Sequence, residues 1–133
     1  MGRGLSGIHF WVSDMERTLT FYRAIGLEIP EPEGDGQFVQ VTLPNGVDLG
    51  FGSYDVTRRY DPAFKVPSGG KGGLALQFNL DSRPAVNEMY QRLTTAGYAG
   101  HLAPMDAPWG SRYAEVSDPD GNVVGFQSPQ NWY

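Results

Sequence analysis

The chain is 133 residues long, which suits one domain or two small fused units. Its formal charge of −5 argues against nucleic acid as a partner, because binding phosphate needs clustered Lys and Arg. The absence of cysteine excludes disulfides, thiolate metal sites and a cysteine nucleophile. No apolar run approaches the roughly 20 residues of a membrane span, so we expect a cytoplasmic protein with no membrane partner.

The first half of the chain has the periodicities of a strand, a helix and a hairpin. Met15, Leu19 and Tyr22 recur at helical spacing, and "PNG" at 44–46 separates two β-rich runs. A stretch with Pro and Gly and no clean period then follows. In chain order, these patterns predict a strand over 7–13, a helix over 13–26, strands over 37–43 and 47–53, and a linker over 53–72.

The second half repeats this order of elements. Pro84 falls in the first turn of a predicted helix, and "DPDG" joins two strands as "LPNG" does in the first half. Aligning the halves places His9 over Gln77 and Gly50 over Gly125. This duplication predicts two similar modules. The elements of the second module are a strand over 73–80, a helix over 82–98, and strands over 111–117 and 122–128.

The stretch "SDPDGNVVGFQ" at 117–127 spaces Asp118, Asp120 and Asn122 like oxygen ligands for a metal. A calcium loop of this type needs a glutamate further downstream, and the sequence has none after Glu115. Pro at the second position and Gly at the last are what a type I turn prefers. We therefore interpret the stretch as a structural turn.

Alternation along the strands assigns side chains to two faces of each sheet. With tight turns, Val116 lies opposite Val123 and Ala114 opposite Gly125, while Glu115 points toward the helices. The side chains expected against the helices are those of Phe38, Leu49, Phe51, Tyr113, Glu115, Val124 and Phe126. Those expected on the opposite, open face are His9, Trp11, Val39, Val41, Asp48, Gly50, Gln77, Asn79, Arg112, Ala114, Val116, Val123, Gly125 and Gln127.

Two long stretches, "GIHFWVSDMERTLTFYRAIGLEI" and "APWGSRYAEVSDPDGNVVGFQ", resemble the vicinal oxygen chelate superfamily. This superfamily includes glyoxalase I, extradiol dioxygenases, fosfomycin-resistance enzymes and bleomycin-resistance proteins. The resemblance covers almost the whole chain and implies an α+β fold of two tandem βαβββ modules whose mixed sheets curl into a cup. The modules are expected at 1–66 and 67–133 within one structural domain, and a homodimer is expected because it is common in the family.

The resemblance also indicates where a metal would bind. Metal-using members carry ligands on the first and last strands of each module, which correspond to His9, Gly50, Gln77 and Gly125. The last-strand positions usually carry Glu, and here both are glycine. Because a divalent ion takes three or more protein donors and favours a carboxylate, we expect no metal cofactor. If zinc, nickel or iron is used, His9 and Gln77 are the expected ligands.

Glycine at both positions removes side-chain volume from the floor of the expected cup. The freed space predicts a pocket for a flat organic molecule, closed by aromatic loop residues and Met105. The loop residues considered are Tyr54, Tyr60, Phe64, Met105, Trp109 and Trp132. The expected ligand-binding residues are His9, Trp11, Val39, Val41, Asp48, Gly50, Gln77, Asn79, Trp109, Arg112, Ala114 and Gly125.

Some residues leave more than one interpretation open. His9 is a pocket anchor, a structural residue or, if any residue is catalytic, the catalytic one. Arg112 holds an anionic ligand group or pairs with Asp48 or Glu115, and His101 is expected in an exposed loop. Gln77 and Asn79 either bond to each other or face the cup.

The leading functional hypothesis is a metal-independent small-molecule binding protein. It would sequester an antibiotic or a planar aromatic metabolite stoichiometrically, either a cationic glycopeptide or a neutral planar compound. The second hypothesis is a glyoxalase-like lyase, isomerase or dioxygenase that uses a metal held by His9 and Gln77. The third is a structural or regulatory dimer with a vestigial cup.

Overall fold

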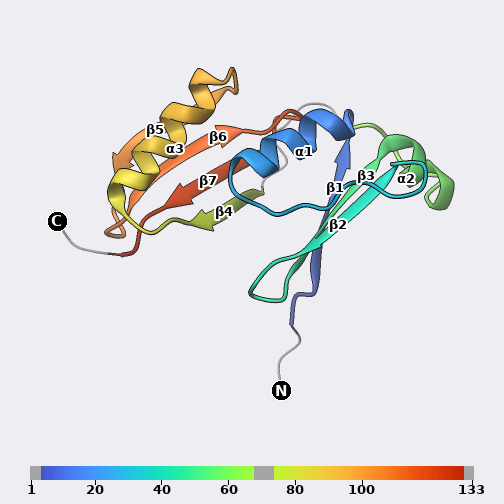
Figure 1. The fold of residues 1–133 in the computed structure, drawn as a ribbon, viewed down its shortest axis with the longest axis horizontal. Helices are drawn as coiled ribbons and strands as arrows, with labels where there is room; N and C mark the ends of the chain where they lie inside the picture. The colour runs from blue at the N-terminus through green and yellow to red at the C-terminus, as the bar shows by residue number, and fades with distance from the viewer. Residues whose placement is uncertain (1–3, 68–73, 131–133) are drawn as a thin grey trace. The chain divides into compact units, whose positions relative to one another are not determined.

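The structure, a computed structural model, describes residues 4–67 and 74–130. Within these residues the chain forms an α+β fold, as predicted, with two mixed sheets and three helices. The chain divides into two compact units, Met1–Pro67 and Ser68–Tyr133, and each unit contains its own sheet (Figure 1).

The first unit contains a three-stranded sheet in the order β1-β3-β2. β1 pairs in parallel with β3, and β2 pairs antiparallel with β3. Within residues 4–67, two strands follow α1 in this unit where three were expected, so it lacks one strand of the βαβββ order. Its elements are β1 (Gly7–Val12), α1 (Met15–Ala24), β2 (Phe38–Thr42), β3 (Asp48–Ser53) and α2 (Tyr54–Tyr60).

The second unit has the full βαβββ order and a four-stranded sheet, β4-β7-β6-β5. β4 pairs in parallel with β7, whereas the other two pairs are antiparallel. Its helix α3 packs along one face of the sheet (Figure 1). Its elements are β4 (Ala75–Asn79), α3 (Arg83–Thr95), β5 (Gly100–Asp106), β6 (Arg112–Ser117) and β7 (Val123–Gln127).

The two long helices begin at side-chain caps. The Asp14 carboxylate accepts a hydrogen bond from the backbone N–H of Arg17 at 3.0 Å, and the Ser82 hydroxyl accepts one from Ala85 at 3.2 Å. These bonds satisfy backbone donors that have no partner within the helix. The polar residues before the apolar stripes therefore fix where α1 and α3 start.

Aromatic packing holds α1 to the first sheet. The Phe10 ring stacks on Phe51 at a centroid distance of 5.2 Å, and the Tyr22 ring of α1 contacts both at 5.7 and 5.2 Å. Tyr22 and Phe51 are fully buried. We call the face opposite α1 in the first sheet, and opposite α3 in the second, the open face.

Each hairpin loop is one residue longer than the two-residue turn assumed from the sequence. In the first, Gly46 N–H donates to Leu43 O and Leu43 N–H donates to Val47 O, both at 2.8 Å. The loop therefore contains three residues and ends at Gly46, whose φ of +89° suits glycine. The second hairpin has the same form, with Asp118 bonded to Asn122 and Gly121 at φ +86°.

The extra residue shifts the register by one and moves side chains to the opposite face. Ala114 pairs with Phe126 and Val116 with Val124, and all four side chains are fully buried. The open-face prediction was therefore wrong for Val39, Val41, Ala114, Val116 and Arg112, whose strand positions face the helices. It was wrong in the other direction for Phe38, Tyr113 and Glu115, which lie on the open face.

Two elements were missed. The stretch interpreted as a linker begins with α2, where the Ser53 hydroxyl accepts a hydrogen bond from Val56 N–H at 3.1 Å. His101 and Met105 were expected in loops, but they lie in β5. β5 is an edge strand that contains Pro104, and its pairing with β6 has two register shifts.

Candidate functional site

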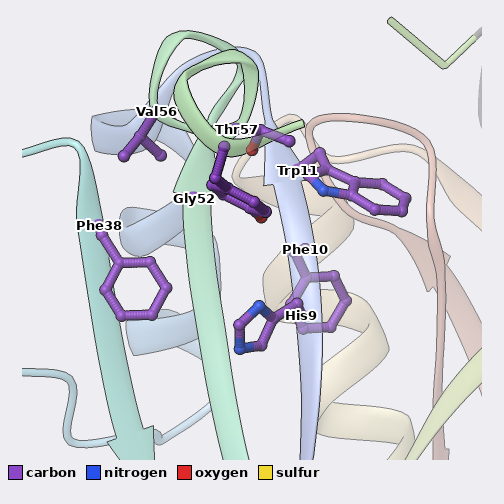
Figure 2. A pocket seen from close by; sticks show the side chains of 8 residues that line it. His9, Phe10, Trp11, Phe38, Gly52, Val56 and Thr57 are labelled. Carbon is purple, nitrogen blue, oxygen red and sulfur yellow. The ribbon is translucent and has the colours of Figure 1, made fainter. Parts of the chain in front are cut away.

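A pocket of about 240 Å³ lies on the open face of the first sheet. Its floor includes Gly52 of β3, and side chains of β1, β2 and α2 surround it (Figure 2). Aromatic rings supply most of its wall. The lining residues are His9, Phe10, Trp11, Phe38, Gly52, Val56, Thr57 and Tyr60.

His9 and Phe38 lie on either side of β3 (Figure 2). His9 is the parallel partner of Gly50, and its imidazole covers the space that a Gly50 side chain would take. A Cβ at Gly50 would lie 2.9 Å from His9 Cδ2, 3.0 Å from His9 Nε2 and 3.4 Å from Phe38 Cε1. The freed space at Gly50 is thus filled by the protein's own rings, and the pocket lies beside it, over Gly52.

Helix α2, which directly follows β3, closes the pocket at that end of the sheet (Figure 2). The Thr57 hydroxyl is buried and donates to Ser53 O at 2.9 Å, so it is already used within the protein. A Cβ at Gly52 would lie 3.4 Å from Val56 Cγ1. Glycine at position 52 therefore keeps this part of the pocket open.

Trp11 forms the rim of the pocket and is 46% exposed. Its ring centroid lies 5.8 Å from that of Phe64, and the ring centroids of Tyr54 and Phe64 are 5.6 Å apart. Tyr60, also on the rim, is 66% exposed. Exposed aromatic side chains grouped around a hollow are typical of a surface that binds an apolar ligand.

The open face of the second sheet differs at the corresponding glycine. The Tyr113 hydroxyl and ring edge fill the space that a Gly125 side chain would take. The hydroxyl donates to Glu115 Oε2 at 2.6 Å. Burial, followed by this hydrogen bond and the charge of Glu115, raises the pKa of Tyr113 above its usual value.

Hydrogen bonds connect three further polar side chains, those of Trp109, Gln127 and Asn79. Trp109 Nε1 donates to Gln127 Oε1 at 3.2 Å, and Gln127 Nε2 donates to Asn79 Oδ1 at 3.0 Å. Asn79 is thus bonded to Gln127 and not to Gln77. His101 Nε2 lies 3.7 Å from Glu115 Oε1.

The family comparison matches most of the chain. The sequence model of the Glyoxalase/Bleomycin resistance protein/Dioxygenase superfamily covers residues 4–126. The chain belongs to this superfamily. A comparison with curated proteins found no match.

Several solved structures of the superfamily have a similar fold. An enzyme of this family from Burkholderia phytofirmans PsJN has a TM-score of 0.80 and 22% identity, covering 95% of this chain and 98% of its own. A glyoxalase-related enzyme from Fulvimarina pelagi has a TM-score of 0.79 and 22% identity, covering 95% and 88%. A lactoylglutathione lyase from Agrobacterium tumefaciens has a TM-score of 0.70 and 22% identity, covering 97% and 96%.

The superfamily's metal-ligand positions do not fit a metal in either unit. In the first unit Gly50 offers no donor beside His9, and in the second Gly125 offers none beside Gln77. Glu115 lies next to Gly125 on the open face, but its carboxylate accepts the hydrogen bond of Tyr113. Across residues 4–67 and 74–130, no group of three or more His, Asp or Glu side chains could hold an ion.

Other polar residues considered in the sequence have structural partners. Asp118 is 5% exposed, and its carboxylate accepts hydrogen bonds from Asp120 N–H and Asn122 N–H at 2.9 and 2.8 Å, as expected for a turn. Asp48 lies on the open face but outside the pocket lining, and its carboxylate accepts a hydrogen bond from the Thr42 hydroxyl at 2.5 Å. Arg112 pairs with Asp106 of β5 at 3.1 Å, not with either expected carboxylate.

Sequence reasoning missed five residues of the pocket lining, Phe10, Phe38, Gly52, Val56 and Thr57. Phe38 was assigned to the core by the shifted register, and Val56 and Thr57 lie in the helix interpreted as a linker. The signal for that helix was Ser53, which caps it, with Asp55 in its first turn and two arginines in its last. Trp132 lies outside the described residues. No helix of the described chain is both long and apolar enough to cross a membrane.

Proposed function

We propose that the protein binds a small planar aromatic molecule, without a metal ion, in the pocket of the first unit. The pocket itself carries this proposal: a hollow of about 240 Å³ bordered by His9, Trp11, Phe38 and Tyr60 beside a glycine floor. Aromatic walls with few polar groups suit a flat organic ligand, which stacks on the rings and removes their apolar surface from water. The plausible role is stoichiometric sequestration of an antibiotic or metabolite.

Metal independence is part of the proposal. It is supported by glycine at the last-strand ligand positions and by the side chains that fill both spaces, the His9 ring at Gly50 and the Tyr113 hydroxyl at Gly125. Binding by stacking and one hydrogen bond needs no Lewis acid. That the protein acts in the cytoplasm as a homodimer stays a prediction from the sequence.

Tryptophan fluorescence tests the proposal. A planar ligand in the pocket should quench Trp11, which lines it, and quenching should be unchanged by a chelator. Trp11→Phe should abolish the quenching, whereas Trp109→Phe in the second unit should retain it. Quenching that survives Trp11→Phe, or that requires a divalent ion, contradicts the proposal.

A binding measurement without tryptophan provides the second test. Phe38→Ala removes one ring from the wall at a half-exposed position, so the fold should tolerate it. Isothermal titration should then show about tenfold weaker binding, because an aromatic contact is worth roughly 0.5–1.5 kcal/mol beyond its buried area. Unchanged affinity would place the ligand elsewhere.

A further inference from the structure

Among the described residues, the pocket lining contains no Asp, Glu, Lys or Arg side chain. The charged side chains of α2 are Asp55, Arg58 and Arg59, and none of them lines the pocket. Arg58 pairs with Asp55 at 3.1 Å, and Arg59 pairs with Asp35 at 3.1 Å. A charged ligand would therefore meet no unpaired opposite charge in the lining.

The charged side chains beside the rim favour neither a cationic nor an anionic ligand. The Arg58 guanidinium lies 5.9 Å from the centroid of the Phe64 ring, and Phe64 in turn packs against Trp11 of the pocket. A cation stacked on Trp11 would meet no carboxylate in the lining. An anion would have to compete for Arg58 with Asp55, which pairs with it at 3.1 Å.

The available polar groups limit what the ligand can carry. Thr57 already donates its hydroxyl to the backbone, and the Tyr60 hydroxyl lies on the exposed rim. His9 is the polar side chain that lies beside the floor, and its ring nitrogens can donate or accept a hydrogen bond. His9 is thus the principal polar contact that this aromatic wall offers a ligand.

We infer that the ligand is an uncharged aromatic molecule of one or two fused rings with a single hydrogen-bonding group that meets His9. This inference rests on the proposed function and specifies its ligand class. The volume of about 240 Å³ lies below the roughly 300–1,000 Å³ of pockets for drug-sized ligands. It favours a small neutral compound over the cationic glycopeptide that the acidic composition admits.

Three probes that share one ring system test the ligand class. They are naphthalene carboxamide, naphthoate and naphthylmethylammonium, substituted at the same ring position and therefore neutral, anionic and cationic. With the wild-type protein, the carboxamide should bind at least about tenfold more tightly than either ion, because a charge placed in this lining loses water without gaining a partner. Quenching of Trp11 reports the affinities.

A matched pair of variants tests whether the lining charge sets this preference. Val56 lines the pocket from the first turn of α2, where an aspartate is favourable for a helix. Val56→Asp should improve binding of naphthylmethylammonium about tenfold relative to Val56→Asn, which has nearly the same shape without the charge. The carboxamide should bind both variants with similar affinity.

The outcomes separate this inference from the proposed function. If either ionic probe binds wild type as tightly as the carboxamide, the neutral class is wrong and the proposed function stands. If no probe binds, the proposed function fails for ligands of this size, and the inference fails with it. If Val56→Asp and Val56→Asn bind the cation equally, the probes do not occupy this pocket and the inference is overturned.

Discussion

Gly50→Ala should weaken ligand binding without unfolding the protein. The new Cβ would lie 2.9 Å from His9 Cδ2, whereas unbonded carbon atoms prefer about 3.5–4.0 Å. The imidazole must therefore move by about 0.6 Å or more, or rotate to another rotamer. Since His9 is the polar side chain beside the pocket floor, this movement should remove its contact with the ligand.

The expected size of each effect follows from the groups involved. A hydrogen bond contributes about 0.5–1.5 kcal/mol net, so losing it should raise Kd about two- to tenfold. The backbone at Gly50 is not left-handed, and replacing glycine by alanine in a strand gains roughly 0.5–1 kcal/mol. An off-rotamer ring costs a similar amount, so the free energy of unfolding should change by less than about 1 kcal/mol.

A double-mutant cycle provides the assay. Kd for naphthalene carboxamide is measured for wild type, Gly50→Ala, His9→Ala and the double variant, and urea unfolding checks stability. If Gly50 acts by positioning His9, then Gly50→Ala should have little further effect once His9 is alanine. Equal weakening in both backgrounds, or no weakening of the wild type, would refute this reasoning.

Three further predictions concern the scaffold. Tyr113→Phe removes the hydrogen bond to Glu115 and should destabilise the fold by about 1–2 kcal/mol. Because the folded protein raises the pKa of Tyr113, the wild type should keep this advantage below about pH 10 and lose it as the pH rises further. Urea unfolding of both proteins below and above this pH measures the difference. Asp118→Ala leaves turn donors without their acceptor and should cost about 2 kcal/mol in the same assay, with Asp118→Asn, which keeps one oxygen, costing less. Ser53→Ala should cost about 1 kcal/mol and weaken carboxamide binding, since Ser53 caps the helix that closes the pocket; unchanged affinity would show that α2 is held by other contacts.

The sequence predicted most elements of the fold because their periodicities are strong. The spacing of Met15, Leu19 and Tyr22 identified α1, and the repeated turn signals identified both hairpins. The superfamily resemblance was also confirmed by the match over residues 4–126. These signals are local, and each one involves residues close together in the chain.

The two missed elements have weak local signals for physical reasons. α2 has seven residues, too few for its apolar side chains to form a recognisable stripe, so its N-terminal cap was its clearest mark. β5 contains Pro104 and begins at Gly100, and both residues are disfavoured inside a regular strand. An edge strand tolerates them, since one side of its backbone needs no partner in the sheet.

The open face could not be predicted correctly because it depends on the count of residues in each turn. Each hairpin loop has three residues, the third a glycine with positive φ, and not the two that were assumed. This one extra residue shifts the pairing by one and moves the side chains of one strand to the opposite face. The assumption of a two-residue turn placed Phe38 and Tyr113 on the helix side of their sheets, although Phe38 lines the pocket and Tyr113 fills the space beside Gly125 on the open face. A small error in turn geometry therefore became a large error in site residues.

The same repeated glycine has different consequences in the two units. At Gly50 the space is covered by the ring of His9, an exposed residue of β1 that lines the pocket. At Gly125 the space is filled by Tyr113, which is only 7% exposed and donates a hydrogen bond to Glu115. Because an exposed ring can adjust to a ligand and a buried hydrogen-bonded one cannot without losing its bond, the proposed binding site lies in the first unit, and Tyr113 contributes stability in the second.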